Sequence, residues 1–567
     1  MKFKIITLGL ICSVNSIAQT ELLIPPLLEG GTYNLTMAND SVSFLPGAYT
    51  QTIGYNGAYL GPTLLLEKGE TVDITVNNET DDTTTAHWHG LHVAAFNDGG
   101  PHSLILSGDS WNPIFEVMDH AATYWYHPHL HTKTGEQAMK GAAGLIIVKD
   151  DTEAALELPR NYGVDDFPLV IQTQEFNAEN QINPDGMRDS IMLVNGIIDP
   201  FVEMPAQVVR MRILNADQER NYNFGFTDDK TFHIIGSDGG LLNATVSATR
   251  VRLAPGERVE VLLDLSDMVG ETLHLMSYAS EIPMGTQGGP SMLMPDTDMP
   301  MPMMDSPING TDFDILEINV IVPTIDPVTT VPTDLVTNVI LDIEEVNATR
   351  VITFTPKDDP TPMEAMDGPF FFNDSSFNMN RIDQIVPLGN IEIWELRNQT
   401  MVAHPFHIHD VQFYILDIDG ELPSIDKQGR KDVVSVPPMD TVRFITIFED
   451  FAGETPYMYH CHNLMHEDGG MMRQFVVTDF SGIDEVVNNL LNVSVYPNPA
   501  QSTIMVTATE MEQLTVSIQN MSGEIVSREN MNTNVHSLNI SDLANGVYLL
   551  VISDGTKNMT KKLIIQH

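Results

Sequence analysis

The sequence predicts an all-β protein made of several β-sandwich domains. At 567 residues the chain is too long for one hydrophobic core, and at about 150 residues per domain it divides into three or four. Between residues 20 and 480, short strand-like runs such as 72–76, 208–214 and 444–448 are separated by Gly, Pro, Asn and Asp at sandwich spacing. Long amphipathic helical patterns are scarce. Three sandwiches of about 150 residues would fill this stretch.

The first 18 residues have the pattern of a secretory signal peptide. Met1–Lys4 is basic, Ile5–Cys12 is apolar, and Ser16–Ala18 offers a small-residue exit. We expect cleavage after Ala18, and a buried first helix is the alternative. The apolar run is too short to span a bilayer, and no other segment reaches about 20 apolar residues.

The C-terminal residues 488–567 are predicted to form a separate small β-sandwich, because runs such as 514–518 and 546–552 alternate with turns. The opening Tyr496-Pro497-Asn498-Pro499 and the ending Lys561-Lys562-Leu563-Ile564 resemble the C-terminal sorting domain of type IX secretion cargo. The resemblance implies recognition by a secretion machinery and export across an outer membrane, followed by release or surface attachment. A generic accessory sandwich is the alternative.

Shifts in composition predict the remaining boundaries. A break is expected near residue 160, and the Pro- and Thr-rich stretch 323–337 is typical of a linker. The predicted division is a signal peptide, three sandwich domains and the sorting domain, at residues 1–18, 19–160, 161–325, 326–480 and 488–567.

Charge and cysteine content exclude several classes of protein. The 77 acidic residues outnumber 28 basic ones, for a net charge of −49, which argues against binding to nucleic acids or anionic membranes, since both need basic patches. The two cysteines are Cys12 and Cys461, too few for a disulfide scaffold. Signal cleavage would leave Cys461 as a lone thiol in an exported protein, so it is either buried and inert or bound to something.

The 18 histidines concentrate in His-x-His pairs. Random placement would give roughly 0.6 such pairs. The sequence has five: His87/His89, His127/His129, His129/His131, His407/His409 and His460/His462. Residues i and i+2 of a strand share a face, so four separate pairs can offer eight imidazoles to one cavity, which is too many for one metal ion and suits three. His131 is expected to lie beside the ligands and not among them.

A second constellation surrounds Cys461. It follows His460 and precedes His462, with His466 and Met471 close behind. If 460–462 is extended, Cys461 points away from both flanking histidines. Its thiolate can then bind a different copper, completed by His466, Met471 and the distant His404, because two His, one Cys and an axial Met form a blue copper site.

Residues 20–480 resemble the three-domain multicopper oxidases of the laccase, spore-coat-oxidase and cuprous-oxidase kind. Four motifs carry the resemblance: His87-Trp88-His89-Gly90, His127-Pro128-His129, His404-Pro405-Phe406-His407-Ile408-His409, and His460 through Met471. It implies three cupredoxin-like Greek-key sandwiches that bind four coppers. His87 and His407 resemble type 2 ligands. The type 1 ligands correspond to His404, Cys461, His466 and Met471, and the paired type 3 ligands to His89, His127, His129, His409, His460 and His462.

The resemblance also implies a mechanism. A reductant gives electrons singly to type 1 copper, and they pass through Cys461 to the cluster, where dioxygen is reduced to water by four electrons. Asp98 and Glu467 match acids that supply protons in the family. A solvated surface carboxylate is the alternative for each of these two.

Methionine is abundant, with 31 residues. Seven lie in one Pro- and Gly-rich stretch: Met284, Met292, Met294, Met299, Met301, Met303 and Met304. Thioethers favour Cu(I), so an extra Cu(I) site is one hypothesis and a loop that covers the copper site is the other. Thr400 stands where cuprous oxidases place an acidic substrate ligand. The reductant therefore stays open between a cuprous or other metal ion and a phenolic compound.

These features predict a secreted or surface-attached monomeric enzyme that uses dioxygen. A non-enzymatic copper-sequestering protein is the alternative, disfavoured by the complete ligand set. A two-domain copper nitrite reductase would need fewer His-x-His motifs.

Overall fold

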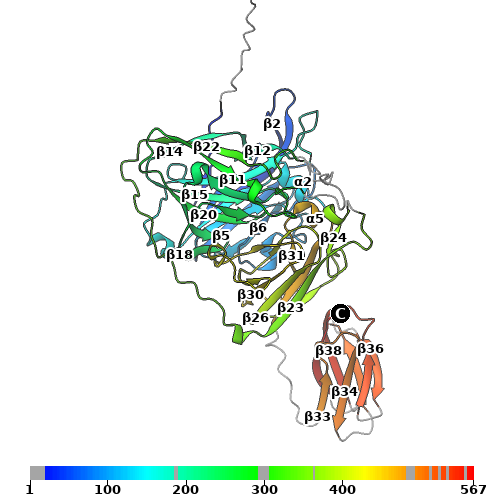
Figure 1. Ribbon diagram of the computed structural model, residues 1–567. Coiled ribbons are helices and arrows are strands. Elements are labelled where there is room, and N and C mark those ends of the chain that lie inside the picture. Colours follow the sequence, from blue (N-terminus) through cyan, green and yellow to red (C-terminus); the bar gives the residue numbers. More distant parts are fainter. Residues whose placement is uncertain are drawn as a thin grey trace, which may run out of the picture.

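A computed structural model describes residues 19–183, 189–291, 306–361, 364–479, 492–509, 514–520, 525–531, 535–553 and 558–567. The predicted signal peptide lies outside these ranges, as do all the methionines of the 284–304 stretch except Met284. The described part consists of paired β-sheets joined by loops (Figure 1).

The first pair of sheets encloses a core that includes Leu35, Ile74 and Trp88. One sheet contains, in order, β1 (Leu27–Leu28), β4 (Thr63–Glu67), β10 (Gly144–Lys149), β9 (Ala122–His127) and β6 (His87–His89). The other contains β3 (Thr50–Tyr55), β2 (Thr32–Val42), β5 (Thr71–Asn78) and β7 (Ser110–Trp111), with β8 (Ile114–Glu116) also paired to β5. Burial alternates along β5, as expected where one face of a strand meets the core.

The second pair encloses the largest core, with Phe167, Ile213 and Val261 among its residues. One sheet contains, in order, β13 (Ile197–Ile198), β12 (Ile191–Val194), β11 (Asp166–Gln174), β15 (Val208–Asn215), β20 (Arg258–Asp264), β17 (Phe232–Ser237) and β18 (Gly240–Ala248). The other contains β14 (Phe201–Pro205), β22 (Phe313–Ile321), β21 (Thr272–Ser277), β16 (Tyr222–Phe226) and β19 (Val251–Leu253).

The third pair buries Trp394, Phe406 and Phe444 together with Cys461 and Met471. One sheet contains, in order, β24 (Phe370–Phe372), β23 (Ala348–Pro356), β26 (Asn390–Asn398), β30 (Thr441–Phe448) and β28 (Phe413–Ile418). The other contains β25 (Gln384–Pro387), β32 (Met472–Thr478), β31 (Tyr457–Cys461), β27 (His404–Ile408) and β29 (Val433–Val436).

A fourth, smaller sandwich follows near the C-terminus, around Val506, Ile518 and Leu550. Its sheets contain β33 (Asn492–Tyr496), β34 (Thr503–Thr509) and β37 (Val535–Asn539), and β36 (Ile525–Met531), β35 (Leu514–Gln519), β38 (Gly546–Ser553) and β39 (Asn558–Ile565).

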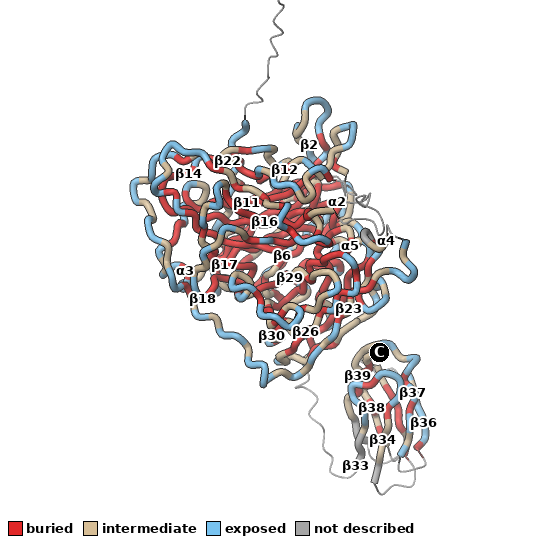
Figure 2. Tube along the Cα trace, in the orientation of Figure 1, coloured by how far each residue is buried: buried red, intermediate tan, exposed pale blue. Residues whose placement is uncertain are grey.

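Helices are short wherever the structure describes the chain. They are α1 (Ala95–Asp98), α2 (Thr134–Met139), α3 (Asp151–Ala154), α4 (Glu364–Asp367) and α5 (Leu464–Asp468), with 3₁₀ turns η1 (Thr227–Asp229), η2 (Ala279–Glu281), η3 (Ile343–Glu345) and η4 (Ile425–Lys427). Within the described ranges, no helix has the length and apolar content needed to cross a membrane. Buried residues follow the strands and exposed ones the loops (Figure 2). The predicted all-β sandwich architecture is confirmed, whereas the residue bounds of the domains stay a prediction.

Candidate metal centres

Strand register brings the predicted histidine ligands together in pairs. In the first sandwich, antiparallel pairing of β6 with β9 sets His87 opposite His127. In the third, pairing of β27 with β31 sets His407 opposite His460. The second histidine of each motif lies two residues further along. Each of the two sandwiches therefore presents four of the eight imidazoles at one end of a sheet.

The two sets of imidazoles meet across the interface between the first and third sandwiches. The Nε2 atom of His129 lies 3.1 Å from Nε2 of His409 and 3.1 Å from Nε2 of His460, and the latter two are 3.4 Å apart. Imidazole nitrogens bound to one ion at about 2.0–2.1 Å are held about 3–3.5 Å from each other. These three nitrogens therefore fit a single metal ion.

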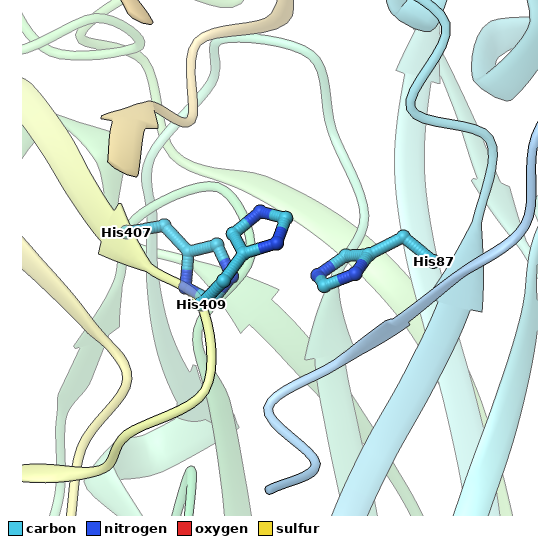
Figure 3. A group of neighbouring side chains, drawn as sticks. All are labelled: His87, His407 and His409. Carbon is cyan, nitrogen blue, oxygen red and sulfur yellow. The ribbon is translucent and has the colours of Figure 1, made fainter. Parts of the chain in front are cut away.

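A second group of three lies beside the first. His89 Nδ1 is 3.4 Å from His127 Nε2, and the ring of His462 is 4.9 Å from that of His89. The rings of His87 and His409 stack at 3.9 Å, and those of His89 and His407 at 3.8 Å. Figure 3 shows His87 reaching across from one sandwich toward His407 and His409 of the other. All eight imidazoles thus form one cluster.

Hydrogen bonds to backbone carbonyls fix which nitrogen faces the cluster in four of the rings. His87 Nδ1 donates to the carbonyl of Asp98 at 2.9 Å, and His407 Nδ1 donates to the carbonyl of Asp432 at 2.8 Å. Similar Nδ1 contacts to backbone carbonyls are made by His127 (to Pro128) and His460 (to Cys461). Because a carbonyl only accepts, Nδ1 carries the proton and Nε2 keeps a free lone pair.

His89 is oriented the other way. Its Nε2 lies 3.1 Å from Oδ1 of Asp432, and its Nδ1 faces the cluster. The carboxylate accepts the Nε2 proton, which leaves Nδ1 as the nitrogen that can bind a metal.

The environment of the cluster suits neutral, metal-binding imidazoles. Burial lowers the pKa of several rings well below 6.5, and neighbouring histidines lower it further, at His89, His127, His129, His407 and His462. Among the described residues, the buried Nε2 atoms of His87 and His407 and both ring nitrogens of His462 have no hydrogen-bond partner. Buried polar atoms without partners are costly, so a ligand that accepts their lone pairs fits this site.

Cys461 forms the second centre on the opposite side of β31. Its Sγ lies 3.5 Å from Nδ1 of His404 and 3.6 Å from Nδ1 of His466. Burial raises the pKa of the Cys461 thiol, so a bound cation is what would favour the thiolate. Met471 is buried in the same core, and its carbonyl accepts the N–H of Cys461 at 3.0 Å. The distances among Cys461, His404 and His466 fit the thiolate and two imidazoles of a blue copper site.

One contact and one difference in burial distinguish the two histidines of this centre. Thr400 Oγ1 lies 2.8 Å from Nε2 of His404, so the hydroxyl orients the ring with Nδ1 toward Cys461. His404 is fully buried, whereas His466 keeps 6% of its surface exposed. His466 is therefore the imidazole of this centre that lies nearest to solvent.

The two acids predicted from the sequence both contact cluster histidines. Asp98 Oδ2 accepts from Nδ1 of His409 at 2.8 Å. Glu467 approaches Nδ1 of His129 at 3.2 Å and Nδ1 of His460 at 3.1 Å. Both carboxylates are buried. The alternative that they are solvated surface groups is therefore wrong.

His131 does not join the cluster contacts; its ring packs edge-on against Phe377 at 5.0 Å. Sequence reasoning missed Asp432, which contacts His89 and His407, and Arg258, which binds Asp432 through two bonds of 2.6 Å. No motif marks either residue, because Asp432 lies 174 positions from Arg258, 343 from His89 and 25 from His407.

Sandwich domains that share such an imidazole cluster and carry an adjacent Cys–His–His centre define a copper-dependent redox protein. Comparisons with known proteins agree. Family models described as "Multicopper oxidase" match residues 36–153 and 347–481, and a "Secretion system C-terminal sorting domain" model matches residues 494–566.

Two curated relatives match most of the chain. "Multicopper oxidase mco" of Staphylococcus haemolyticus (strain JCSC1435) is 32% identical over 482 residues, covering 82% of this chain and 94% of the relative. "Cell division protein FtsP" of Escherichia coli (strain K12) is 30% identical over 471 residues, covering 81% and 93%. The chain belongs to the multicopper oxidase family and is an oxidoreductase of that type, as its motifs predict.

Solved structures show the same fold. The laccase-like multicopper oxidase CueO of Ochrobactrum sp. is similar at 34% identity with a TM-score of 0.71, covering 81% of this chain and 100% of that one. A multicopper oxidase from Campylobacter jejuni, described as a metallo-oxidase, is similar at 27% identity with a TM-score of 0.66, covering 81% and 96%.

Proposed function

We propose that the chain is an exported oxidase that couples one-electron oxidation of a small reductant to the four-electron reduction of dioxygen to water. One observation carries the proposal. Cys461 faces His404 and His466 on one side of β31, while its sequence neighbours His460 and His462 lie in the imidazole cluster on the other side. A single peptide segment therefore connects an electron-accepting centre to a site large enough for several metal ions.

The ligand assignment follows from motif and geometry together. We assign type 1 copper to His404, Cys461, His466 and Met471, type 2 to His87 and His407, and the type 3 pair to His89, His127, His129, His409, His460 and His462. The spacing of the nitrogens groups His129, His409 and His460 for one ion. We assign His89 and His127, with the neighbouring ring of His462, to the other. Copper bound there supplies reversible one-electron chemistry and the reduction of dioxygen.

The two buried acids serve proton delivery in this proposal. Water formation consumes protons at a cluster in which burial lowers the pKa of His89, His127, His129, His407, His409 and His462. Asp98 contacts His409, and Glu467 contacts His129 and His460. Glu467 also accepts from the hydroxyl of Thr134 at 2.8 Å. Each carboxylate lies one residue away from the reacting atoms and can relay protons toward them.

A soft metal ion is the reductant best supported by the surface next to the type 1 centre. Among the described methionines, three have exposed side chains: Met284, Met401 and Met439. Their segments adjoin one another, since Gly285 O accepts from Ala403 N at 2.7 Å, and a Cβ on Gly285 would lie 3.0 Å from Met401 O and 2.8 Å from Pro438 Cγ. Exposed thioethers on segments that adjoin the one carrying His404 favour Cu(I).

The experiment that tests this function is dioxygen uptake by the copper-loaded protein with Cu(I), Fe(II), Mn(II) and a phenol supplied in parallel. We expect uptake with at least Cu(I). Uptake with none of the four donors would contradict the oxidase proposal. Uptake with the phenol alone would keep the oxidase and reject the soft-metal reductant.

A non-catalytic role is the second candidate, because a relative of similar identity is named a cell division protein and a shared fold does not fix activity. The same measurement separates the two roles. A protein that binds copper and consumes no dioxygen would be a binding or sequestering protein.

Export is proposed from the match of residues 494–566 to a secretion sorting domain. The same proposal includes four further predictions from the sequence. They are the signal peptide at 1–18, the domain bounds at 160, 325 and 480, the monomeric state and an extra Cu(I) site in the 284–304 stretch. Truncation after residue 480 should leave the oxidase inside the cell envelope if the sorting domain directs release.

A further inference from the structure

Arg258 lies at the start of β20, in the second sandwich, which supplies none of the predicted ligands. Its guanidinium is 1% exposed, and all five N–H groups have acceptors. Nη1 and Nη2 each bind one oxygen of Asp432 at 2.6 Å. The remaining bonds reach the carbonyls of Thr123 at 3.0 Å, Gly256 at 3.0 Å and Asp238 at 2.9 Å. One side chain thus contacts all three large sandwiches.

Asp432, which Arg258 holds in place, in turn contacts two cluster histidines. Its Oδ1 accepts from His89 Nε2 at 3.1 Å, and its backbone carbonyl accepts from His407 Nδ1 at 2.8 Å. His89 comes from the first sandwich and His407 from the third. A carboxylate behind a ligand fixes both the tautomer and the direction of the ring.

The residues around the ion pair of Arg258 and Asp432 leave room for it and hold it in place. Gly90, the last residue of the first motif, has φ +89°, and a Cβ there would lie 2.5 Å from Oδ2 of Asp432 and 2.8 Å from Nη2 of Arg258. Only glycine leaves room for the pair at this position. Lys431 forms ion pairs of 2.8 Å with Asp238 and with Glu257, both in the second sandwich. The segment that carries Asp432 is therefore fixed to the second sandwich on two sides.

We propose that Arg258 and Asp432 form a positioning clamp through which the ligand-free second sandwich holds His89 and His407 in place and so determines copper occupancy of the cluster. The clamp touches no reacting atom. It acts by holding ligands from two other sandwiches in one geometry. The inference rests on the proposed assignment of His89 and His407 as copper ligands.

The test measures copper binding and not turnover. Removing one partner would strand a buried charge, so the variant is the double substitution Arg258→Met/Asp432→Leu, since replacing a buried ion pair by apolar residues of similar volume is often neutral for stability. The backbone carbonyl of residue 432 remains. The matched control is Arg212→Met/Asp166→Leu. That pair is also buried and bidentate, at 2.8 and 3.0 Å, and no hydrogen bond or ion pair joins it to an imidazole of the cluster.

The full-length proteins are dialysed against buffered Cu(II), and copper per chain, the type 2 electron paramagnetic resonance signal and the blue absorption of the Cys461 centre are recorded. We expect the double variant to retain the blue absorption, which reports a folded third sandwich, and to bind cluster copper about 10–100-fold more weakly. The control should match the wild type. Equal cluster occupancy in the double variant and the wild type would overturn the clamp.

A second variant covers a failure to fold. Arg258→Lys keeps the positive charge beside Asp432, but a single ammonium group replaces the planar fork that reaches both carboxylate oxygens. If the double variant lacks blue absorption, Arg258→Lys provides the test of the clamp. We expect it to bind cluster copper about tenfold more weakly than the wild type. Binding equal to that of the wild type would overturn the clamp. A wild-type protein that takes up only the copper bound by Cys461 would instead contradict the proposed function itself.

Discussion

Nδ1 of His409 lies 2.8 Å from Oδ2 of Asp98, although 311 positions separate the two residues in the sequence. The contact joins a proposed copper ligand on the third sandwich to a carboxylate on the first. Burial raises the pKa of Asp98, but contacts with His409 and His87 lower it more, and the net result is a pKa below the usual value. Asp98 therefore accepts a hydrogen bond from His409 Nδ1–H, which leaves the lone pair of Nε2 available for a metal ion.

Replacing Asp98 with Asn should preserve the blue absorption, since the Cys461 centre is untouched, and should slow dioxygen reduction by about 10²-fold or more, because the amide cannot take up and release a proton. Stopped-flow reoxidation of the fully reduced enzyme measures this step. Asp109→Asn, at an exposed position of the same sandwich, is the control. Unchanged reoxidation in Asp98→Asn would remove Asp98 from the mechanism.

Replacing Thr400 with Val should weaken copper binding at the Cys461 centre by about tenfold. The valine removes the oxygen that lies 2.8 Å from His404 Nε2, so the ring loses its orienting contact. Titration of the apoprotein with copper, followed by the blue absorption, measures the change. Thr446→Val loses a different buried hydroxyl contact, to Gln412 O, and should titrate like the wild type. Equal titration of both variants would show that Thr400 is dispensable.

Replacing Gly256 with Ala should reduce the copper content of the cluster. Gly256 has φ +83°, and a Cβ there would lie 3.0 Å from three ring atoms of His462. Gly270 has the same φ with nothing within 4 Å, so Gly270→Ala introduces the backbone strain, about 1–2 kcal/mol, without the contact. Both variants should unfold at lower temperature, but copper analysis should show a loss in Gly256→Ala alone. A loss in both would assign the effect to strain.

Replacing Met284, Met401 and Met439 together with Leu should raise KM for Cu(I) by about tenfold, equivalent to about 1.4 kcal/mol of binding. Leucine keeps apolar volume and removes the thioether. Steady-state dioxygen uptake with Cu(I) and with a phenol measures the selectivity, and phenol oxidation should not change. Met268→Leu/Met276→Leu, in the second sandwich, is the control. An equal effect on both donors would mean that the methionines do not bind the ion.

His92 should make stability fall as the solution becomes alkaline. Its Nδ1 lies 2.7 Å from Asp410 O, its Nε2 lies 3.2 Å from Asp450 Oδ2, and its backbone N–H donates to Asp119. Burial lowers the pKa of His92, but Asp410 and Asp119 raise it more, to about 10. Because this exceeds the unfolded value of about 6.5, the stabilisation is complete below pH 6.5 and is lost as the pH rises through 10.

Melting temperatures of the apoprotein between pH 6 and 10 check this dependence. The decrease should be smaller in His92→Gln than in the wild type. His233→Gln is the control, because burial lowers the pKa of His233 and its contribution lies at lower pH. A curve for His92→Gln that runs parallel to the wild type would refute the role of His92.

The sequence by itself determined the all-β class and the twelve candidate ligands. Both depend on local periodicity: residues i and i+2 of a strand share a face, so a His-x-His pair such as His407 and His409 indicates a shared cavity, and Cys461 between two histidines must face away from it. The same alternation marks the buried face of strands such as β5. Patterns of this kind need no knowledge of the rest of the chain.

Tertiary structure alone decided how those ligands are held. Asp432 lies 343 positions from His89 and 174 from Arg258, and no spacing rule relates residues that meet only when three sandwiches pack together. Which nitrogen of His89 faces the cluster depends on where one buried carboxylate lies. The exposed methionines Met284, Met401 and Met439 come likewise from three separate segments that adjoin one another only in the fold. A strand's own geometry sets which face a side chain occupies, whereas packing between sandwiches sets what that side chain meets.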